Sequence, residues 1–176
     1  MTLTKATPEL CGGQAMRTAA QVMKLMRLFD QQTVLLACIF STFAMTGLIW
    51  LIQLVQYPLF ARVGRESFCD YEREHCHRIT PLVLPLMATE LASSLWLGFR
   101  PIAGLESMLM IGACLAVSLW VSTFLLQVPL HNRLCREFCE ADHRRLVLSN
   151  WLRTVVWTVR SAMLLMVLGE LIQLPV

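Results

Sequence analysis

Four long apolar stretches constrain the fold of this chain more than any other feature. Each reaches or approaches the roughly 20 residues that a helix needs to cross a bilayer. They cover residues 33–57, 81–99, 105–130 and 154–175. The composition agrees, because 56% of the 176 residues are hydrophobic and only 15% are charged, against about a quarter charged in soluble domains. The sequence therefore predicts an all-α integral membrane protein, a four-helix bundle with up-down-up-down connectivity.

The first 32 residues differ from the rest of the chain. An early Pro and Gly-Gly precede a basic pattern rich in Met and Leu, which is typical of a tail followed by a short interfacial amphipathic helix. The apolar run after it starts too late and is too long for a cleavable signal peptide. We therefore expect a tail over residues 1–32 and a transmembrane domain over residues 33–176.

Up-down-up-down connectivity places both long polar segments, residues 58–80 and 131–153, at one end of the bundle, which we call the mouth. They contain nine basic residues: Arg62, Arg65, Arg73, Arg78, Arg133, Arg136, Arg144, Arg145 and Arg153. The opposite side has five: Lys5, Arg17, Lys24, Arg27 and Arg100. The positive-inside tendency then predicts a multi-pass protein of the cell membrane whose mouth lies in the cytoplasm.

Glu90 lies near the centre of the second span, where an unpaired carboxylate is costly and must point into the bundle. Arg160 is the natural partner, because the helical rise places Glu90 about 15 Å and Arg160 about 9 Å below the mouth. The pair is either an ion pair that fixes helix register or part of a polar cavity in which Glu90 relays protons or binds a ligand.

Glu72 and His75 share one helix face at a spacing that ferritin-like metal sites use. His131 could join them from across the mouth. Metal or haem ligation by a set of these three residues, contacts to a ligand, and a solvated surface all remain open, with Tyr71 beside them at the entrance. If the helix continues unbroken through Pro81, His75 lies about 22 Å from the midplane acid; one site containing both requires a fold back at that proline.

A polar and aromatic stripe begins the fourth span, with Asn150, Arg153, Trp157 and Arg160 at three- or four-residue steps. Trp151 and Arg153 also fit interfacial anchoring. Arg160 lies deeper than anchoring needs, so it could meet an anion, a carbonyl or a quinone oxygen. Asn150 and Arg153 are expected to tie the mouth segments together.

The seven scattered cysteines argue against a disulfide framework. Cys135 and Cys139, opposite Cys76 and its flanking histidines, have zinc-type ligand chemistry but not the close C-x2-C spacing. We expect His77 and His143 to face solvent. The net charge of +3 is dispersed, which argues against nucleic acid as a partner. Phosphate-loop, serine-hydrolase, zincin and selectivity-filter motifs are absent.

The segments QLVQYPLFARVG, FCDYEREH, PLMATE, VPLH and NWLRTVVWTVRSAML, in this order, resemble a largely uncharacterised family of small four-span bacterial membrane proteins over residues 33–170. The chain is more remotely similar to anthrone-oxygenase-like membrane proteins, which share four spans, a polar mouth and an N-x-x-R-T element. That resemblance implies oxidation of a polycyclic aromatic substrate. The position of Glu72 is often histidine in the closer family.

Two functions follow as hypotheses. In the first, the protein is an oxygenase-like or redox enzyme for a lipophilic small molecule from the bilayer, with His75 or His131 as base or ligand and Arg160 stabilising an oxyanion above Glu90. In the second, it is a non-catalytic subunit or a small transporter in which Glu90 relays protons. A homo-oligomer or another membrane protein is the expected protein partner.

Overall fold

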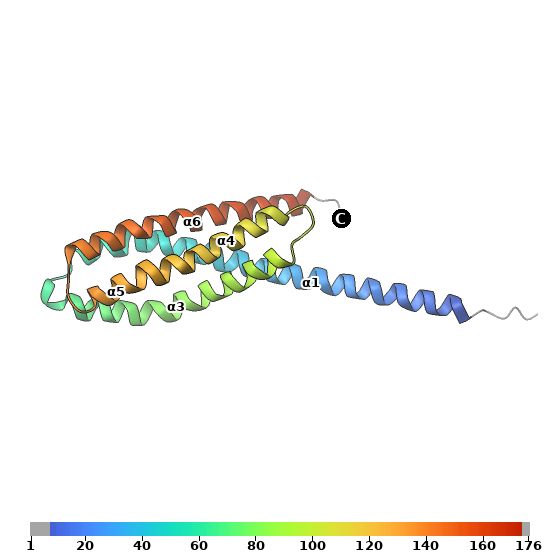
Figure 1. The fold of residues 1–176 in the computed structure, drawn as a ribbon, viewed down its shortest axis with the longest axis horizontal. Helices are drawn as coiled ribbons and strands as arrows, with labels where there is room; N and C mark the ends of the chain where they lie inside the picture. The colour runs from blue at the N-terminus through green and yellow to red at the C-terminus, as the bar shows by residue number, and fades with distance from the viewer. Residues whose placement is uncertain (1–7, 174–176) are drawn as a thin grey trace, which may run out of the picture.

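The computed structural model describes residues 8–173 (Figure 1). Its helices are α1 (Pro8–Leu51), α2 (Tyr57–Phe60), α3 (Arg65–Phe99), α4 (Glu106–Ser122), α5 (Val128–Leu134) and α6 (Glu140–Gln173), with π-helices η1 (Ile52–Gln56) and η2 (Thr123–Gln127). The described residues contain no strand, and four helical segments are long and apolar enough to cross a membrane: Asp30–Phe60, Arg65–Phe99, Glu106–Leu134 and Glu140–Ile172. The predicted all-α four-helix bundle is confirmed.

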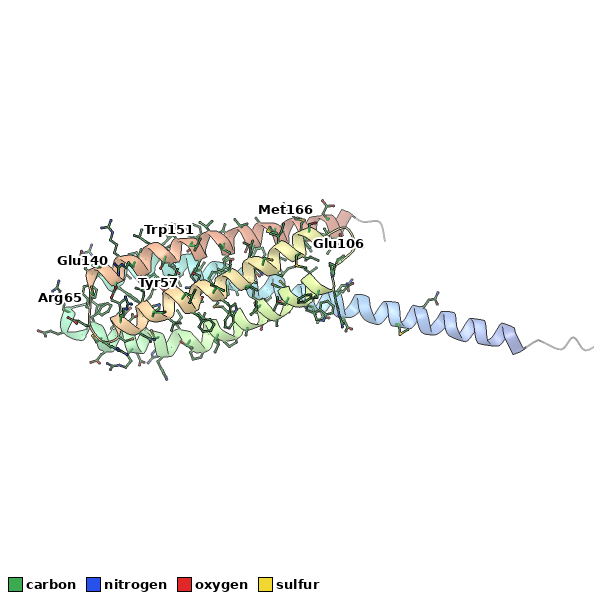
Figure 2. All side chains as sticks on the ribbon, in the orientation of Figure 1. Tyr57, Arg65, Glu106, Glu140, Trp151 and Met166 are labelled. Atoms are coloured by element: carbon green, nitrogen blue, oxygen red, sulfur yellow. The ribbon has the colours of Figure 1, made fainter. Side chains whose placement is uncertain are left out.

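Consecutive spans run antiparallel, as predicted (Figure 1). α3 packs between α1 and α4, and α6 closes the bundle against α1 and α4. Arg65 and Glu140, the first residues of α3 and α6, lie at the same end of the molecule, whereas Glu106 at the start of α4 lies at the other (Figure 2). The polar segments therefore share one mouth.

The N-terminal segment is continuous with the first span. α1 runs from Pro8 to Leu51 without a break, and its first part extends beyond the bundle (Figure 1). The expected boundary at residue 32 is thus not marked by a separate interfacial helix. The tip of the predicted tail, residues 1–7, lies outside the described residues.

α3 extends the second span by its polar N-terminal half. Pro81 and Pro85 lie inside this one helix, so the chain does not fold back at Pro81. His75 and Glu90 are consequently about 22 Å apart along the helix axis. The alternative in which both belong to one site is excluded.

Both π-helices precede a proline in a repeated Gln-x-Pro-Leu sequence. η1 ends at Gln56 before Pro58, and η2 ends at Gln127 before Pro129. Proline has no N–H for the carbonyl four residues earlier, and its ring crowds that carbonyl, so a wider turn accommodates it within a continuous span. The two π-helices carry the first and third spans past their prolines into the mouth.

Tight packing holds the other end of the bundle together. A Cβ added at Gly98 of α3 would lie 3.1 Å from the Cβ of Ala113 on α4, so a small residue is needed where these helices approach most closely. A cluster that includes Leu97 and Leu109 packs beside this contact. A second cluster at the mouth surrounds the fully buried Phe60 and Phe68.

Candidate functional site

The interior of the helix bundle contains a closed polar network around Glu90. Arg160 Nε donates to Glu90 Oε1 over 2.9 Å, Thr42 Oγ1 donates to the same oxygen over 3.0 Å, and the indole of Trp157 donates to Oε2 over 2.9 Å. Glu90 and Arg160 are each only 2% exposed. The predicted pairing of these two residues is therefore present, and both carboxylate oxygens have donors.

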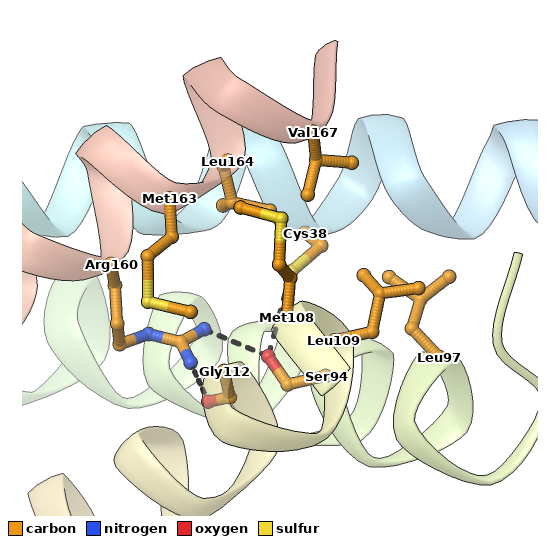
Figure 3. A pocket seen from close by; sticks show the side chains of 10 residues that line it. All are labelled: Cys38, Ser94, Leu97, Met108, Leu109, Gly112, Arg160, Met163, Leu164 and Val167. Atoms are coloured by element: carbon orange, nitrogen blue, oxygen red, sulfur yellow. Dashed lines mark hydrogen bonds between the residues drawn. The ribbon is translucent and has the colours of Figure 1, made fainter. Parts of the chain in front are cut away.

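The guanidinium of Arg160 has no free direction toward a ligand. Its two terminal nitrogens donate to Ser94 Oγ, over 2.8 Å, and to the backbone oxygen of Gly112 (Figure 3). The cavity beside it measures about 20 Å³, which is room for about one water molecule. This arrangement favours the structural interpretation of the Glu90–Arg160 pair.

The mouth contains a second chain of contacts, centred on His131. Its Nδ1 lies 2.5 Å from Glu72 Oε1, and its Nε2 lies 3.1 Å from the hydroxyl of Tyr57. Glu72 is fully buried. The ring of His75 lies 6.0 Å from that of His131 and meets the edge of Phe60. The structure thus brings the three predicted metal or ligand residues of the mouth into one neighbourhood.

Arg153 lies between the two networks. Its Nη1 donates to Asn150 Oδ1 over 3.1 Å, and Asn150 in turn donates to Gln53 over 2.8 Å, which ties α6 to η1. The guanidinium carbon lies 5.0 Å from the centre of the Trp157 ring, whose N–H is directed to Glu90. Trp157 therefore separates the arginine of the mouth from the deeper ion pair.

A pocket of about 260 Å³ opens on the side of the bundle between α3 and η2; we call it the lateral pocket. Its polar end is made by Tyr57, His75, Gln127, His131 and Arg153. Its walls are apolar and include Ile52, Ile79, Val83, Leu84, Met87, Trp120, Phe124 and Val128. Leu84 and Phe124 are 50% and 59% exposed on the outer surface, which would face lipid in a membrane. Glu90 and Arg160 are not among the lining residues.

Buried polar atoms without a partner gather at this end of the bundle. Among the described residues there are four such side-chain atoms, and three belong to the mouth: Glu72 Oε2, Gln127 Oε1 and Arg153 Nε. Buried polar groups are normally hydrogen-bonded, so each exception needs an explanation. A bound ligand or ion would supply the missing partners.

The remaining predicted residues have peripheral positions. Tyr71 is exposed and accepts a hydrogen bond from Gln56 over 2.8 Å. Trp151 lies on the outer surface, edge to face with Trp50 at 5.8 Å, as interfacial anchoring predicts. His77 is exposed as expected.

The expectation for His143 is wrong. It is only 8% exposed, and its Nε2 donates to the backbone oxygen of Tyr57 over 2.8 Å. This oxygen belongs to the short helix α2, which ends at Phe60, and carbonyls in the last turn of a helix accept hydrogen bonds from outside donors. His143 therefore stabilises the backbone beneath the pocket.

Tyr57 and Gln127, which the sequence places at the mouth as an interfacial aromatic and a polar residue, both line the lateral pocket. The sequence feature that could have identified them as pocket residues is their position in the two Gln-x-Pro-Leu repeats. Each π-helix redirects the side chains that follow it, and this redirection cannot be deduced from regular helical spacing.

The fold and the site together define a multi-pass, all-α membrane protein with a polar mouth and a laterally open pocket. No family model matches the chain, and the comparisons with curated proteins and with solved structures found no significant match. Its function is therefore argued from the geometry of the site itself.

Proposed function

We propose that this protein is an oxygenase-like or redox enzyme that acts on a lipophilic small molecule bearing a phenolic, enolic or carbonyl oxygen. The observation that carries the proposal is Arg153. This cation is 6% exposed, lines the lateral pocket and forms no ion pair with a carboxylate among the described residues. Burying a charge is expensive unless it is paired, and an anionic ligand oxygen would be the missing partner.

The polar end of the pocket suits a hydroxylated ring. Arg153 Nε has no acceptor and Gln127 Oε1 has no donor, so a ligand with one negatively charged or carbonyl oxygen and one O–H group would satisfy both. Charge-assisted hydrogen bonds of this kind are stronger than neutral ones. The apolar walls and the exposed rim at Leu84 and Phe124 support uptake of such a molecule from the bilayer.

The same groups support oxidation chemistry. Removal of a proton from a phenol or an enolisable ketone leaves an anion whose charge Arg153 would stabilise on oxygen. That anion is a better electron donor than its protonated parent, and dioxygen is the acceptor that we propose. For a hydroquinone, transfer of two electrons and the two hydroxyl protons to dioxygen would give the quinone and hydrogen peroxide. His75 lines the same pocket and is the candidate proton acceptor, whereas the Tyr57 hydroxyl can donate a hydrogen bond to a ligand oxygen.

The test is dioxygen uptake by protein purified in detergent, with lipophilic hydroquinones and anthrone-type ketones as substrates. We expect saturable uptake by the wild type and its loss in Arg153→Gln. The matched control is Arg145→Gln, an exposed arginine on the same helix. Uptake that is equal in the wild type and Arg153→Gln would contradict the role of Arg153, and no uptake with any substrate would contradict the enzyme.

The alternative, a non-catalytic subunit or a small transporter that uses Glu90 as a proton relay, has less support. Both Glu90 oxygens are hydrogen-bonded, and the residue is 2% exposed. Saturable quenching of Trp120 fluorescence by a quinone without dioxygen uptake would favour this alternative, with the lateral pocket as a carrier or partner site.

We also propose that the mouth lies in the cytoplasm, on the strength of its excess of arginine. Cys139 is an exposed thiol in the connection between α5 and α6, so its labelling shows on which side of the membrane the mouth lies. A membrane-impermeant maleimide should label it in inverted vesicles and not in intact cells, with Cys139→Ala as the control. The reverse pattern would place the mouth outside.

A further inference from the structure

We infer that Glu72, Cys76 and His131, with Cys135 as a fourth ligand, bind a divalent metal ion of the zinc type. This site lies at the mouth, where His131 also borders the lateral pocket. The inference goes beyond the proposed function and does not depend on it, since metal binding is measured without a substrate.

The first argument is distance. One ligand atom from each of Glu72, Cys76 and His131 lies within 4.8 Å of the other two. Glu72 Oε1 is 2.5 Å from His131 Nδ1 and 3.7 Å from Cys76 Sγ. Ligands bound to zinc at about 2.0–2.3 Å are separated by only a few ångströms, so small side-chain rotations would place all three around one ion.

The second argument is the arrangement of the ligands on two helices. Glu72 and Cys76 are four residues apart on α3, and His131 and Cys135 are four residues apart across the end of α5. Residues at this spacing are neighbours on one helix face. The thiols of Cys76 and Cys135 are close enough to interact electrostatically, so the two pairs face each other across the gap between the helices.

The third argument is the unsatisfied carboxylate. Glu72 is fully buried, yet its Oε2 has no hydrogen-bond partner. Buried carboxylates are paired or coordinate metals. His131 satisfies only Oε1, and a cation held among the four side chains would neutralise the whole carboxylate.

The ligand chemistry selects the metal. Two thiolates, an imidazole and a carboxylate are a zinc-type set, whereas magnesium and calcium prefer oxygen ligands. Compared with the set expected from sequence, Cys76 replaces His75, which instead lines the lateral pocket. Four protein ligands would close the coordination sphere, so the ion would tie α3 to α5 and orient the His131 ring whose Nε2 meets Tyr57.

The thiols set the conditions for binding. Cys76 and Cys135 would bind a metal ion as thiolates and not as thiols. The metal must therefore displace a proton, and its affinity should fall as the pH is lowered. The protein has to be kept reduced, because two adjacent thiols can otherwise form a disulfide.

The experiment uses the full chain, purified under reducing conditions in detergent and loaded with Co²⁺ as a spectroscopic probe. We expect about one ion per chain and a thiolate-to-cobalt charge-transfer band, with Zn²⁺ displacing Co²⁺. Cys76→Ala should lose the ion and the band, and Cys135→Ala should lose part of the band. The matched control is Cys139→Ala, an exposed thiol near the same site, which should behave as the wild type.

Two results would overturn the inference. The first is a wild-type protein that retains no metal and shows no thiolate band while circular dichroism confirms its helices. The second is a band of equal intensity in Cys76→Ala. An unchanged band in Cys135→Ala would remove that residue from the ligand set. Dioxygen uptake is not part of this readout, so failure of the proposed enzyme activity would leave the metal result intact.

Discussion

The two buried arginines of α6 have opposite surroundings. Arg160 is paired with Glu90, and its terminal nitrogens are also bonded. Arg153, two turns earlier and also buried, is bonded to a neutral asparagine and keeps one nitrogen without a partner. Arg160 lies against a cavity with room for about one water, and Arg153 lines a pocket thirteen times larger by volume, about 260 against 20 Å³.

This difference separates structure from function within one helix. A polar network whose members are all satisfied specifies how helices pack, whereas a partly satisfied one is costly unless something else completes it. The network around Glu90 is fully satisfied, whereas the network at the mouth is only partly satisfied. Burial and charge alone therefore do not identify a functional site. Glu90 and Arg160 are the buried charges that stand out most in the sequence, yet their network leaves no partner for a ligand.

The largest effect is expected from breaking the deep pair. Glu90→Gln leaves Arg160 as an unpaired buried cation and should lower the free energy of unfolding by about 3–5 kcal/mol. Thermal unfolding in detergent measures it, with the exposed Glu170→Gln on α6 as the control. The double variant Glu90→Leu with Arg160→Met should recover much of the loss, and failure to do so would contradict a mainly structural pair.

Arg153→Met should lower stability only slightly but weaken ligand binding strongly. The lost cation–π contact with Trp157 and the bond to Asn150 should cost at most about 1–2 kcal/mol of stability. Affinity for a lipophilic hydroquinone should fall roughly tenfold to hundredfold, because a charge-assisted hydrogen bond is lost. Fluorescence titration checks the binding. A stability loss as large as that of Glu90→Gln, with unchanged ligand affinity, would contradict the assignment of a ligand-binding role to Arg153 and a structural role to Arg160.

Asn150→Ala tests the link that positions Arg153. Asn150 is fully buried and bonded to both Gln53 and Arg153, so its removal should cost about 1–3 kcal/mol. Asn132→Ala, an exposed asparagine of the mouth, is the control in the same unfolding assay. Equal melting temperatures in the two variants would show that the link is dispensable.

The smallest effect is expected on the outer surface. Trp151→Ala removes an edge-to-face contact with Trp50, and such exposed pairs contribute about 0.5–1.5 kcal/mol. Melting temperature should fall slightly, and ligand affinity should not change. A change in affinity would connect this surface to the lateral pocket.

Much of the architecture could be predicted because it depends on composition along the chain. Four apolar runs require four spans, and a midplane carboxylate requires an internal partner, which the depth of Arg160 identified. The proximity of Glu72 and His131 could be anticipated from the shared mouth. The burial of His143 could not, since it depends on a hydrogen bond to the backbone oxygen of Tyr57, a residue far from it in the sequence.

The sequence by itself determined that this chain crosses a membrane with four antiparallel helices and gathers its polar residues at one end, because hydrophobicity and helix length act locally. Only the tertiary structure decided which buried charges are compensated and which are not. The π-helices before Pro58 and Pro129, the unbroken α3 and the separation of Arg153 from Glu90 by Trp157 all depend on how distant segments pack, and packing determines where a ligand can fit.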